Sequence, residues 1–190
     1  MGRIVYIDKL REFFKETPVF RARDVETFTG SSRYAHLILH KLSNKGEVKR
    51  VVKGWYSLHD DPVITVFCFK PAYIGLQEAL SLHNLWEQET NVIIVSTRRI
   101  RTGVRKIFGS NVVIHRIVGE YFFGFEYLKY GEFFIPVSDV EKTLIDLVYF
   151  NEIPSREVLD EMRRKIDKRR LNVYLRRFKP RLRQRVLKLI

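Results

Sequence analysis

The 190-residue chain has one cysteine, Cys68, and no long hydrophobic run. A single cysteine excludes both an internal disulfide and a thiolate metal site. No stretch approaches the roughly 18 apolar residues that a membrane helix needs. Near the N-terminus, the charges of Asp8, Lys9 and Arg11 interrupt the apolar residues that a signal peptide keeps together. We therefore expect a cytoplasmic protein without membrane contact.

Acidic side chains are also few, because 22 Asp and Glu stand against 35 Lys and Arg, for a formal net charge of +13. The excess lies at the two ends. Residues 1–60 carry 12 basic and 7 acidic groups, residues 61–150 carry 9 and 10, and residues 151–190 carry 14 and 5. A solvated, salt-bridged surface is one explanation. The alternative is a polyanionic partner, although charge alone does not separate DNA from RNA, a membrane surface or an acidic protein.

The first 60 residues contain two kinds of apolar spacing. Helical spacing predicts three helices, over residues 7–15, 22–28 and 32–44. Gly30 indicates a turn before the third helix. A serine that follows this glycine is expected to be the N-cap of that helix. Residues 47–58 alternate as two strands joined at Lys53-Gly54. The predicted core side chains are Ile7, Leu10, Phe13, Phe14, Val25, Phe28, Ala35, Ile38, Leu39 and Leu42.

Three helices followed by a β-hairpin form the layout of a winged helix-turn-helix, in which the third helix enters the major groove of DNA. Its side chains outside the core, with those of the hairpin, are then the candidate DNA contacts. Arg33 suits a guanine edge, while the serine, tyrosine and lysine side chains more often bind phosphate. The candidates are Ser31, Ser32, Arg33, Tyr34, His36, His40, Lys41, Lys49, Arg50 and Lys53. The alternative is a winged helix that contacts only protein.

Residues 61–190 predict a second unit, which follows a boundary at Asp60-Asp61-Pro62. It mixes element types, so we expect an α+β fold with an antiparallel sheet. The expected strands cover 63–69, 91–97, 111–118, 121–130 and 133–137, and the expected helices cover 73–86 (ending near Asn84) and 138–150.

Residues 151–190 combine helical apolar stripes with many cations, and Pro180 is placed to open the last helix. This pattern predicts folded amphipathic helices. Their cations suit the DNA backbone, a structured RNA or an acidic protein, and the alternative is a plain solvated face. The candidates for DNA or partner contact are Arg163, Arg164, Lys168, Arg169, Arg170, Arg176 and Arg177.

No metal or cofactor site is predicted. His36 and His40 share a helix face, but residues 37–39 lack the glutamate of a zinc protease motif and no third ligand lies nearby. Two exposed, polar histidines are the simpler interpretation.

No catalytic residue is predicted either. Asp139, Glu141 and Asp146, together with Lys142, loosely resemble a metal-dependent nuclease site. Such a site needs an acidic residue two positions before the lysine, where this chain has Val140. Glu141 and Lys142 are more simply residues compatible with the start of a helix.

Four segments together resemble the AbiE-type antitoxins, a family of predicted transcriptional regulators of viral defence. They are KGWYSL (53–58), AYIGLQEALSLHNLWEQ (72–88), NVIIVSTRRIRT (91–102) and VSDVEKTLIDLVYF (137–150). In that family they correspond to the wing, to a helix, to a strand ending in T-x-R and to an E-K-x-L-I-D helix. Two departures are Asn84, where glycine is usual, and segment 151–190, which matches no family motif.

The resemblance implies a regulator that represses its own operon by binding inverted repeats in its promoter, and that neutralises a nucleotidyltransferase toxin. This is the arrangement of a type IV toxin-antitoxin system in antiviral defence. DNA contact would fall on the third helix and wing, and antitoxin activity on residues 63–190. Binding to inverted repeats also implies a homodimer on double-stranded DNA. The alternatives are a protein-interaction module that binds the toxin without specific DNA binding, a stand-alone regulator, and an enzyme acting on nucleic acid.

Overall fold

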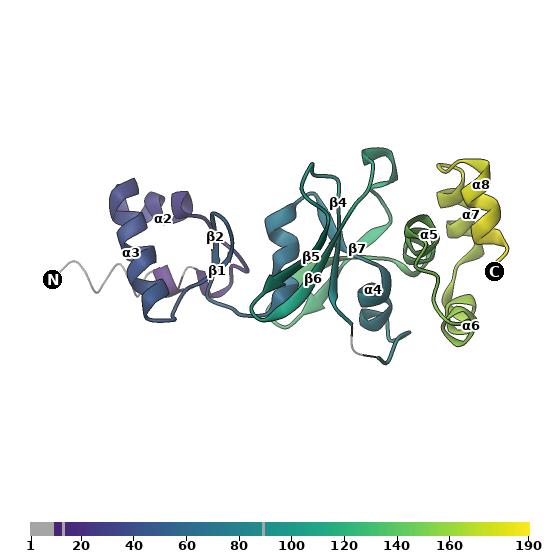
Figure 1. Cartoon of the computed structure of the whole chain (residues 1–190), viewed down its shortest axis with the longest axis horizontal. Helices are drawn as coiled ribbons and strands as arrows, with labels where there is room; N and C mark the ends of the chain where they lie inside the picture. Colours follow the sequence, from purple (N-terminus) through teal and green to yellow (C-terminus); the bar gives the residue numbers. More distant parts are fainter. Residues whose placement is uncertain (1–9, 13, 89) are drawn as a thin grey trace.

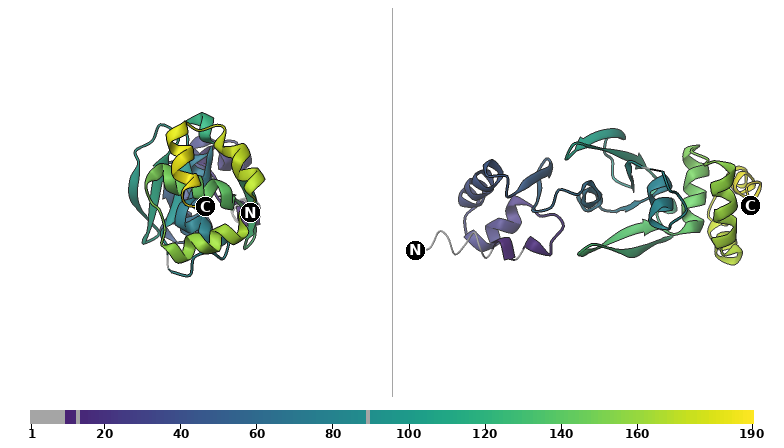
Figure 2. Two further views of the ribbon diagram at one scale, coloured as in Figure 1. Left: turned by 90° about the vertical axis from the view of Figure 1, so that its right-hand side faces the viewer. Right: turned by 90° about the horizontal axis from the view of Figure 1, so that it is seen from below.

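The computed structural model describes residues 10–12, 14–88 and 90–190. The molecule is elongated, with a β-sheet in the middle (Figure 1). The helices α2 (Ala22–Thr29) and α3 (Ser32–Asn44) lie at one end, and α6 (Arg156–Lys165), α7 (Lys168–Leu175) and α8 (Pro180–Leu187) lie at the other. The same order along the long axis appears in the view from below (Figure 2). No helix within the described ranges is long and apolar enough to cross a membrane.

The N-terminal unit has the predicted order of elements. Residues 10–12 and 14–15 are helical, and they precede α2 (Ala22–Thr29) and α3 (Ser32–Asn44). The hairpin follows as β1 (Lys49–Val52) and β2 (Trp55–Ser57). Its core contains Leu10, Phe14, Phe20, Val25, Ala35, Ile38, Leu39, Leu42 and Val48. The predicted core residues Ile7 and Phe13 lie outside the described residues.

The turn between α2 and α3 forms as its residues predict. Gly30 adopts the left-handed conformation with φ of 67°, which costs glycine little because it has no Cβ. Ser31 is the N-cap of α3, and its hydroxyl accepts a hydrogen bond from the backbone N–H of Tyr34 at 3.4 Å.

Segment 63–69 is not the strand that its apolar run predicts. It forms a 3₁₀ helix, η1 (Pro62–Phe69), in which Pro62 opens the helix and the Asp61 carboxylate accepts the N–H of Val63. All residues from 63 to 69 are buried. A run that is buried on every side shows neither strand nor helix periodicity, and this explains the error.

The middle sheet is mixed, which corrects the prediction of an antiparallel sheet. Six strands lie in the order β5-β6-β4-β3-β8-β7. They are β3 (Ala72–Ile74), β4 (Val92–Ser96), β5 (Gly103–Ile107), β6 (Ser110–Arg116), β7 (Phe125–Tyr130) and β8 (Phe133–Ser138). The pairs β3–β8 and β4–β6 are parallel. Strand neighbours distant in sequence are set by tertiary packing, which local patterns do not reveal.

The helix predicted over 73–86 is shorter, because its first residues form the central strand β3. The helix itself, α4, covers Leu76–Leu82. Gly75 separates the two elements, and a Cβ there would lie 2.8 Å from Cγ2 of Val95. Asn84, the departure from the family pattern, has φ of 55°. Asparagine tolerates this left-handed conformation better than most residues, so the turn that glycine usually makes is kept.

Strand β5 was missed by the sequence analysis. It pairs with β6 through a two-residue turn at Phe108 and Gly109, whose φ values are both positive, at 52° and 83°. A hairpin connection of this type usually carries Asn-Gly or Asp-Gly, and here phenylalanine occupies the first position. Strand β7 is also shorter than predicted, because η2 (Gly119–Tyr121) precedes it.

The C-terminal helices form where they are predicted. They are α5 (Val140–Phe150), α6 (Arg156–Lys165), α7 (Lys168–Leu175) and α8 (Pro180–Leu187). Helix α5 lies between the sheet and the last three helices (Figure 1). One hydrophobic cluster joins the sheet, α4 and α5 to buried residues of α6–α8, among them Leu159, Met162, Leu171 and Val186.

Candidate nucleic-acid interface

Every candidate DNA-contact residue lies at the surface of the N-terminal unit. Six of the seven on or before α3 are exposed, and Tyr34 is half-buried because it packs on the core. Leu37 lies on the same outer face and is 42% exposed. The outer face of α3 is therefore a ridge that carries Arg33, Leu37 and Lys41 and is available to a partner.

The hairpin continues this surface on one side only. His36, His40 and Arg50 line a common hollow with Tyr56, between α3 and β1. Tyr34 and Lys41 border a different hollow on the other side of α3. Five of the ten predicted residues therefore line two hollows beside α3, and one of these hollows also contains Arg50 of the hairpin.

Charge on the hairpin is partly neutralised within the molecule. Lys49 pairs with Asp60 at 2.5 Å between Nζ and Oδ2, and this lysine lowers the pKa of the Asp60 carboxyl. Arg50 and Lys53 are exposed and form no ion pair within residues 10–12, 14–88 and 90–190. The unpaired positive charge of the hairpin therefore lies on Arg50 and Lys53.

The described residues contain no group of three or more His, Cys, Asp or Glu side chains that could hold a metal ion. His36 and His40 both lie on the exposed side of α3, and Nδ1 of His40 lies 3.4 Å from Nδ2 of Asn44.

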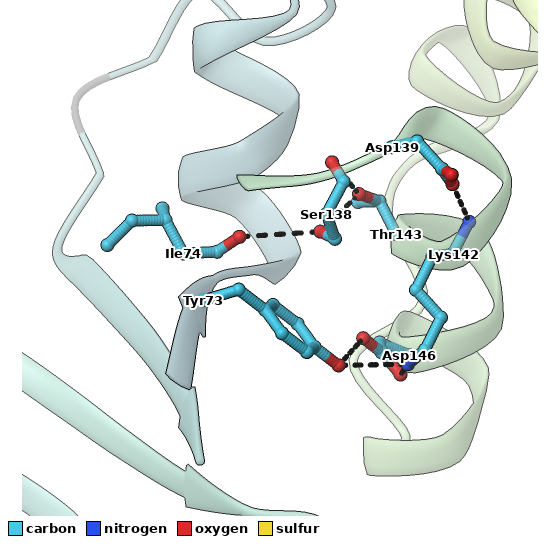
Figure 3. A network of polar contacts seen from close by, with 7 residues as sticks. All are labelled: Tyr73, Ile74, Ser138, Asp139, Lys142, Thr143 and Asp146. Carbon is cyan, nitrogen blue, oxygen red and sulfur yellow. Dashed lines mark hydrogen bonds and ion pairs between the residues drawn. The ribbon is translucent and has the colours of Figure 1, made fainter. Parts of the chain in front are cut away.

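The acidic residues near the start of α5 form a buried network with residues from the sheet (Figure 3). Lys142 and Asp146 are ion-paired and both are fully buried. Nζ of Lys142 also donates to the Tyr73 hydroxyl at 2.9 Å, and this hydroxyl donates to Asp146 at 2.7 Å. Burial lowers the pKa of Lys142 and raises the pKa of Asp146, and the attraction within the pair opposes both shifts.

Asp139 and Glu141 connect α5 to the C-terminal helices. Asp139 is the N-cap of α5, since its carboxylate accepts the N–H of Lys142 at 2.7 Å, and it also accepts the hydroxyl of Tyr174 at 2.7 Å. Burial raises the pKa of that hydroxyl to about 12. Glu141 accepts the N–H of Asp167 at 2.6 Å and lies 3.6 Å from Arg170.

These contacts give the residues of the nuclease-like pattern structural roles. The four side chains Asp139, Glu141, Lys142 and Asp146 are each at most 7% exposed, and their polar atoms contact one another or neighbouring helices. A substrate in solvent has no access to them in this structure. The residues at the helix start are cap-compatible, as predicted. The pair of Lys142 with Asp146 was not predicted, although a four-residue spacing puts both on one helix face.

The candidate contact residues of the C-terminal helices are only partly available. Arg163 and Arg164 pair with Asp160 and Glu161 on their own helix, and Arg170 approaches Glu141. The guanidinium of Arg177 lies 4.3 Å from the centre of the Phe123 ring. Lys168, Arg169 and Arg176 are exposed and have no ion pair in the part of the chain that the structure describes. The structure places all seven residues at the opposite end of the molecule from α3 (Figure 1).

One family model and one solved structure match this chain. Residues 8–59 match the model of a family described as "Transcriptional regulator, AbiEi antitoxin". A search of curated proteins found no significant match. A search of solved structures found the crystal structure of the RV2827C protein from Mycobacterium tuberculosis, with a TM-score of 0.67 and 14% identity. The match covers 97% of this chain and 76% of that one, and at this identity it shows similarity of fold alone. The resemblance to AbiEi antitoxin regulators is thereby confirmed, and the family model places it on residues 8–59.

Proposed function

We propose that the chain is a DNA-binding transcriptional regulator, with α3 as the recognition helix and the β1–β2 hairpin as the wing of a winged helix-turn-helix. The observation that carries this proposal is that residues 8–59, which match the regulator family, contain all ten candidate contact residues, and that none of the ten is buried. We further propose that residues 1–60 act as the DNA-binding domain and residues 61–190 as a second domain.

The mechanism divides recognition between two kinds of contact. Arg33 is the second residue of α3, and its guanidinium has the donor geometry to bind O6 and N7 of guanine in the major groove. Arg50 and Lys53 would neutralise phosphates, which fixes the position of the protein without reading the sequence. Binding that neutralises several phosphates weakens steeply as salt is added.

The test is a titration of labelled duplexes with the full chain, using the DNA upstream of its own reading frame and a scrambled duplex of equal length. We expect Arg33→Ala to lower the preference for the upstream DNA by about 1–3 kcal/mol. Lys53→Ala should weaken both duplexes alike. Arg181→Ala, at the far end of the molecule, is the matched control and should bind as the unchanged chain does. Salt-insensitive binding, or no binding to either duplex, would contradict the proposal.

The antitoxin role is the finer part of the proposal. Lys168, Arg169 and Arg176, together with the exposed apolar side chains of Val173 and Leu187, offer a surface at the end opposite to α3. We propose that residues 61–190 hold a partner there, which the family resemblance suggests is a nucleotidyltransferase toxin. Co-purification with the product of a neighbouring reading frame, lost on Val173→Asp but kept on Leu37→Asp, tests this. Loss of co-purification in the Leu37→Asp variant alone would place the partner on α3 instead.

A further inference from the structure

The loop between β4 and β5, together with the start of β5, is the most concentrated run of cations outside the two chain ends. Residues 98–106 contain Arg98, Arg99, Arg101, Arg105 and Lys106 and no acidic residue. Four of these side chains are exposed and Arg105 is half-buried. No ion pair joins any of them to a carboxylate within the described ranges. We call residues 98–106 the arginine loop.

The arginine loop is held in a defined place at the end of η1. Nη1 of Arg98 donates to the carbonyl of Cys68 at 3.0 Å, and the N–H of Arg98 donates to the Ser96 hydroxyl at 3.1 Å. The guanidinium of Arg105 lies 5.2 Å from the centre of the Phe69 ring and donates to the carbonyl of Arg101 at 2.9 Å. Neither a carbonyl nor a ring removes the positive charge, so these contacts fix the loop and leave its charge unneutralised.

The same end of η1 lies beside the N-terminal unit, since Val19 and Trp55 line a common hollow with Phe67 and Lys70. Val19 and Val51 belong to the hydrophobic cluster of η1. Arg21 stacks on Trp55, the first residue of β2, at 4.0 Å from the ring centre. Burial raises the pKa of the Cys68 thiol to about 12, and the charges of Arg21 and Arg98 both oppose this rise. Arg21 thus contacts the hairpin through Trp55, and Arg98 of the arginine loop contacts η1 through Cys68.

Rigidly held cations without counter-charges repel one another, and at about 0.1 M salt this repulsion extends over about 10 Å. A polyanion bound at the loop would neutralise these charges and remove the repulsion. From this and from the contacts of Arg21 and Arg98, we infer that the arginine loop is a second phosphate-binding element, which grips the backbone of duplex DNA flanking the stretch contacted by α3 and the hairpin. This inference rests on the proposed function, and it extends the DNA-binding surface onto the middle sheet.

The experiment compares two charge-matched variants of the full chain. The loop variant carries Arg99→Gln, Arg101→Gln and Lys106→Gln, and the control carries Arg156→Gln, Lys179→Gln and Arg181→Gln at the far end. Each loses three exposed positive charges. Binding to labelled upstream and scrambled duplexes is measured at a series of NaCl concentrations. A third variant, with Arg99→Lys and Arg101→Lys, keeps the charge of the loop.

We expect the loop variant to bind both duplexes about tenfold to a hundredfold more weakly, with the slope of log K against log salt reduced by about 2 to 3. Its preference for the upstream sequence should be unchanged. Shortening the duplex from its ends should abolish the difference from the unchanged chain. The control and the lysine variant should bind as the unchanged chain does.

Three results would overturn the inference. One is a loop variant whose affinity for duplex DNA and whose salt slope are both unchanged. This result would overturn the inference even if the variant had lost binding to single-stranded RNA. Another is an equal loss of affinity in the far-end control, which would show that only the net charge of the chain matters. A loss in the lysine variant as large as in the loop variant would point to altered loop structure. If the unchanged chain binds neither duplex, the proposed function fails and this inference with it, whereas normal binding with an unaffected loop variant overturns this inference alone.

Discussion

Gly124 occupies a position where a side chain would collide with two elements at once. Its φ is 68°, and a Cβ would lie 2.9 Å from Cβ of Lys142 and 3.0 Å from Cε2 of Tyr174. Its carbonyl accepts the N–H of Asp139 at 3.0 Å. The approach of the chain before β7 to α5 and α7 therefore depends on one missing methyl group.

Gly131 provides the matched control for this position. Its φ is 55°, and a Cβ there would meet nothing within 4 Å. We expect Gly131→Ala to lower the free energy of unfolding by about 1 kcal/mol, from backbone strain alone. Gly124→Ala should lower it by about 2–4 kcal/mol, because overpacking adds to the strain. Denaturant unfolding of the two variants measures both values, and equal losses would show that the close approach has no energetic role.

Single residues were predictable where their role is local. Ala35, Ile38, Leu39 and Leu42 recur at helical spacing, and all four are buried on the inner face of α3. The role of Tyr73 was not predictable, because its partner Asp146 lies 73 residues further along the chain. Nothing in the neighbourhood of Tyr73 distinguishes a core aromatic from one whose hydroxyl completes a buried ion pair.

At the scale of elements, α5 is buried along most of its length, including charged positions that usually face water. Burial disfavours the charged forms of Lys142 and Asp146, so the pKa of the lysine lies below its unfolded value and that of the aspartate above its own. At neutral pH both shifts count against the folded state, since each group would be charged more readily in the unfolded chain. We therefore expect the pair to contribute specificity of packing more than net stability.

Substitution of the pair separates these two effects. With Tyr73→Phe as background, so that no phenol hydroxyl lacks a partner, we expect Lys142→Met or Asp146→Leu alone to cost about 3–5 kcal/mol, because each leaves one buried charge unpaired. The double substitution should be neutral or stabilising by about 1–4 kcal/mol. A double-mutant cycle of unfolding free energies measures the coupling. Additive losses would contradict this account.

The accuracy of the element predictions depended on how much of each pattern is local. The third helix and the hairpin carry their own signals in Gly30, Ser31 and the turn at Lys53-Gly54, and they formed at the expected residues. The predictions for segment 63–69 and for strand β3 were wrong because both segments are buried on all sides. The prediction missed strand β5 because two of the five cations of the arginine loop, Arg105 and Lys106, lie at consecutive positions of the strand and obscure the alternation.

On the scale of the whole molecule, the two proposed domains share a hydrophobic contact. Val51 of β1 and Val19 are buried in the same cluster as η1, on the other side of the predicted boundary at residue 60. A shared core of this kind couples the unfolding of the two parts. The family match ends at residue 59, just before this contact region continues into η1.

This coupling predicts one calorimetric transition for the unchanged chain. Val51→Asp introduces a buried charge without a partner, which costs several kcal/mol and weakens the contact with η1. We expect the variant to show two transitions, the N-terminal unit melting first. Arg50→Asp is the control, because this neighbour is exposed on the same strand, and it should keep a single transition. A single, lowered transition for Val51→Asp would mean that the two parts unfold as one unit without this contact.

The separation of α3 from α6–α8 along the long axis has a consequence for stoichiometry. If two copies occupy the halves of an inverted repeat, the two-fold axis of the DNA duplicates every feature of the chain. Each promoter then displays a pair of C-terminal ends, both directed away from the recognition helices. A partner captured there would be recruited two at a time, and neither copy would need to displace the regulator from the promoter in order to bind.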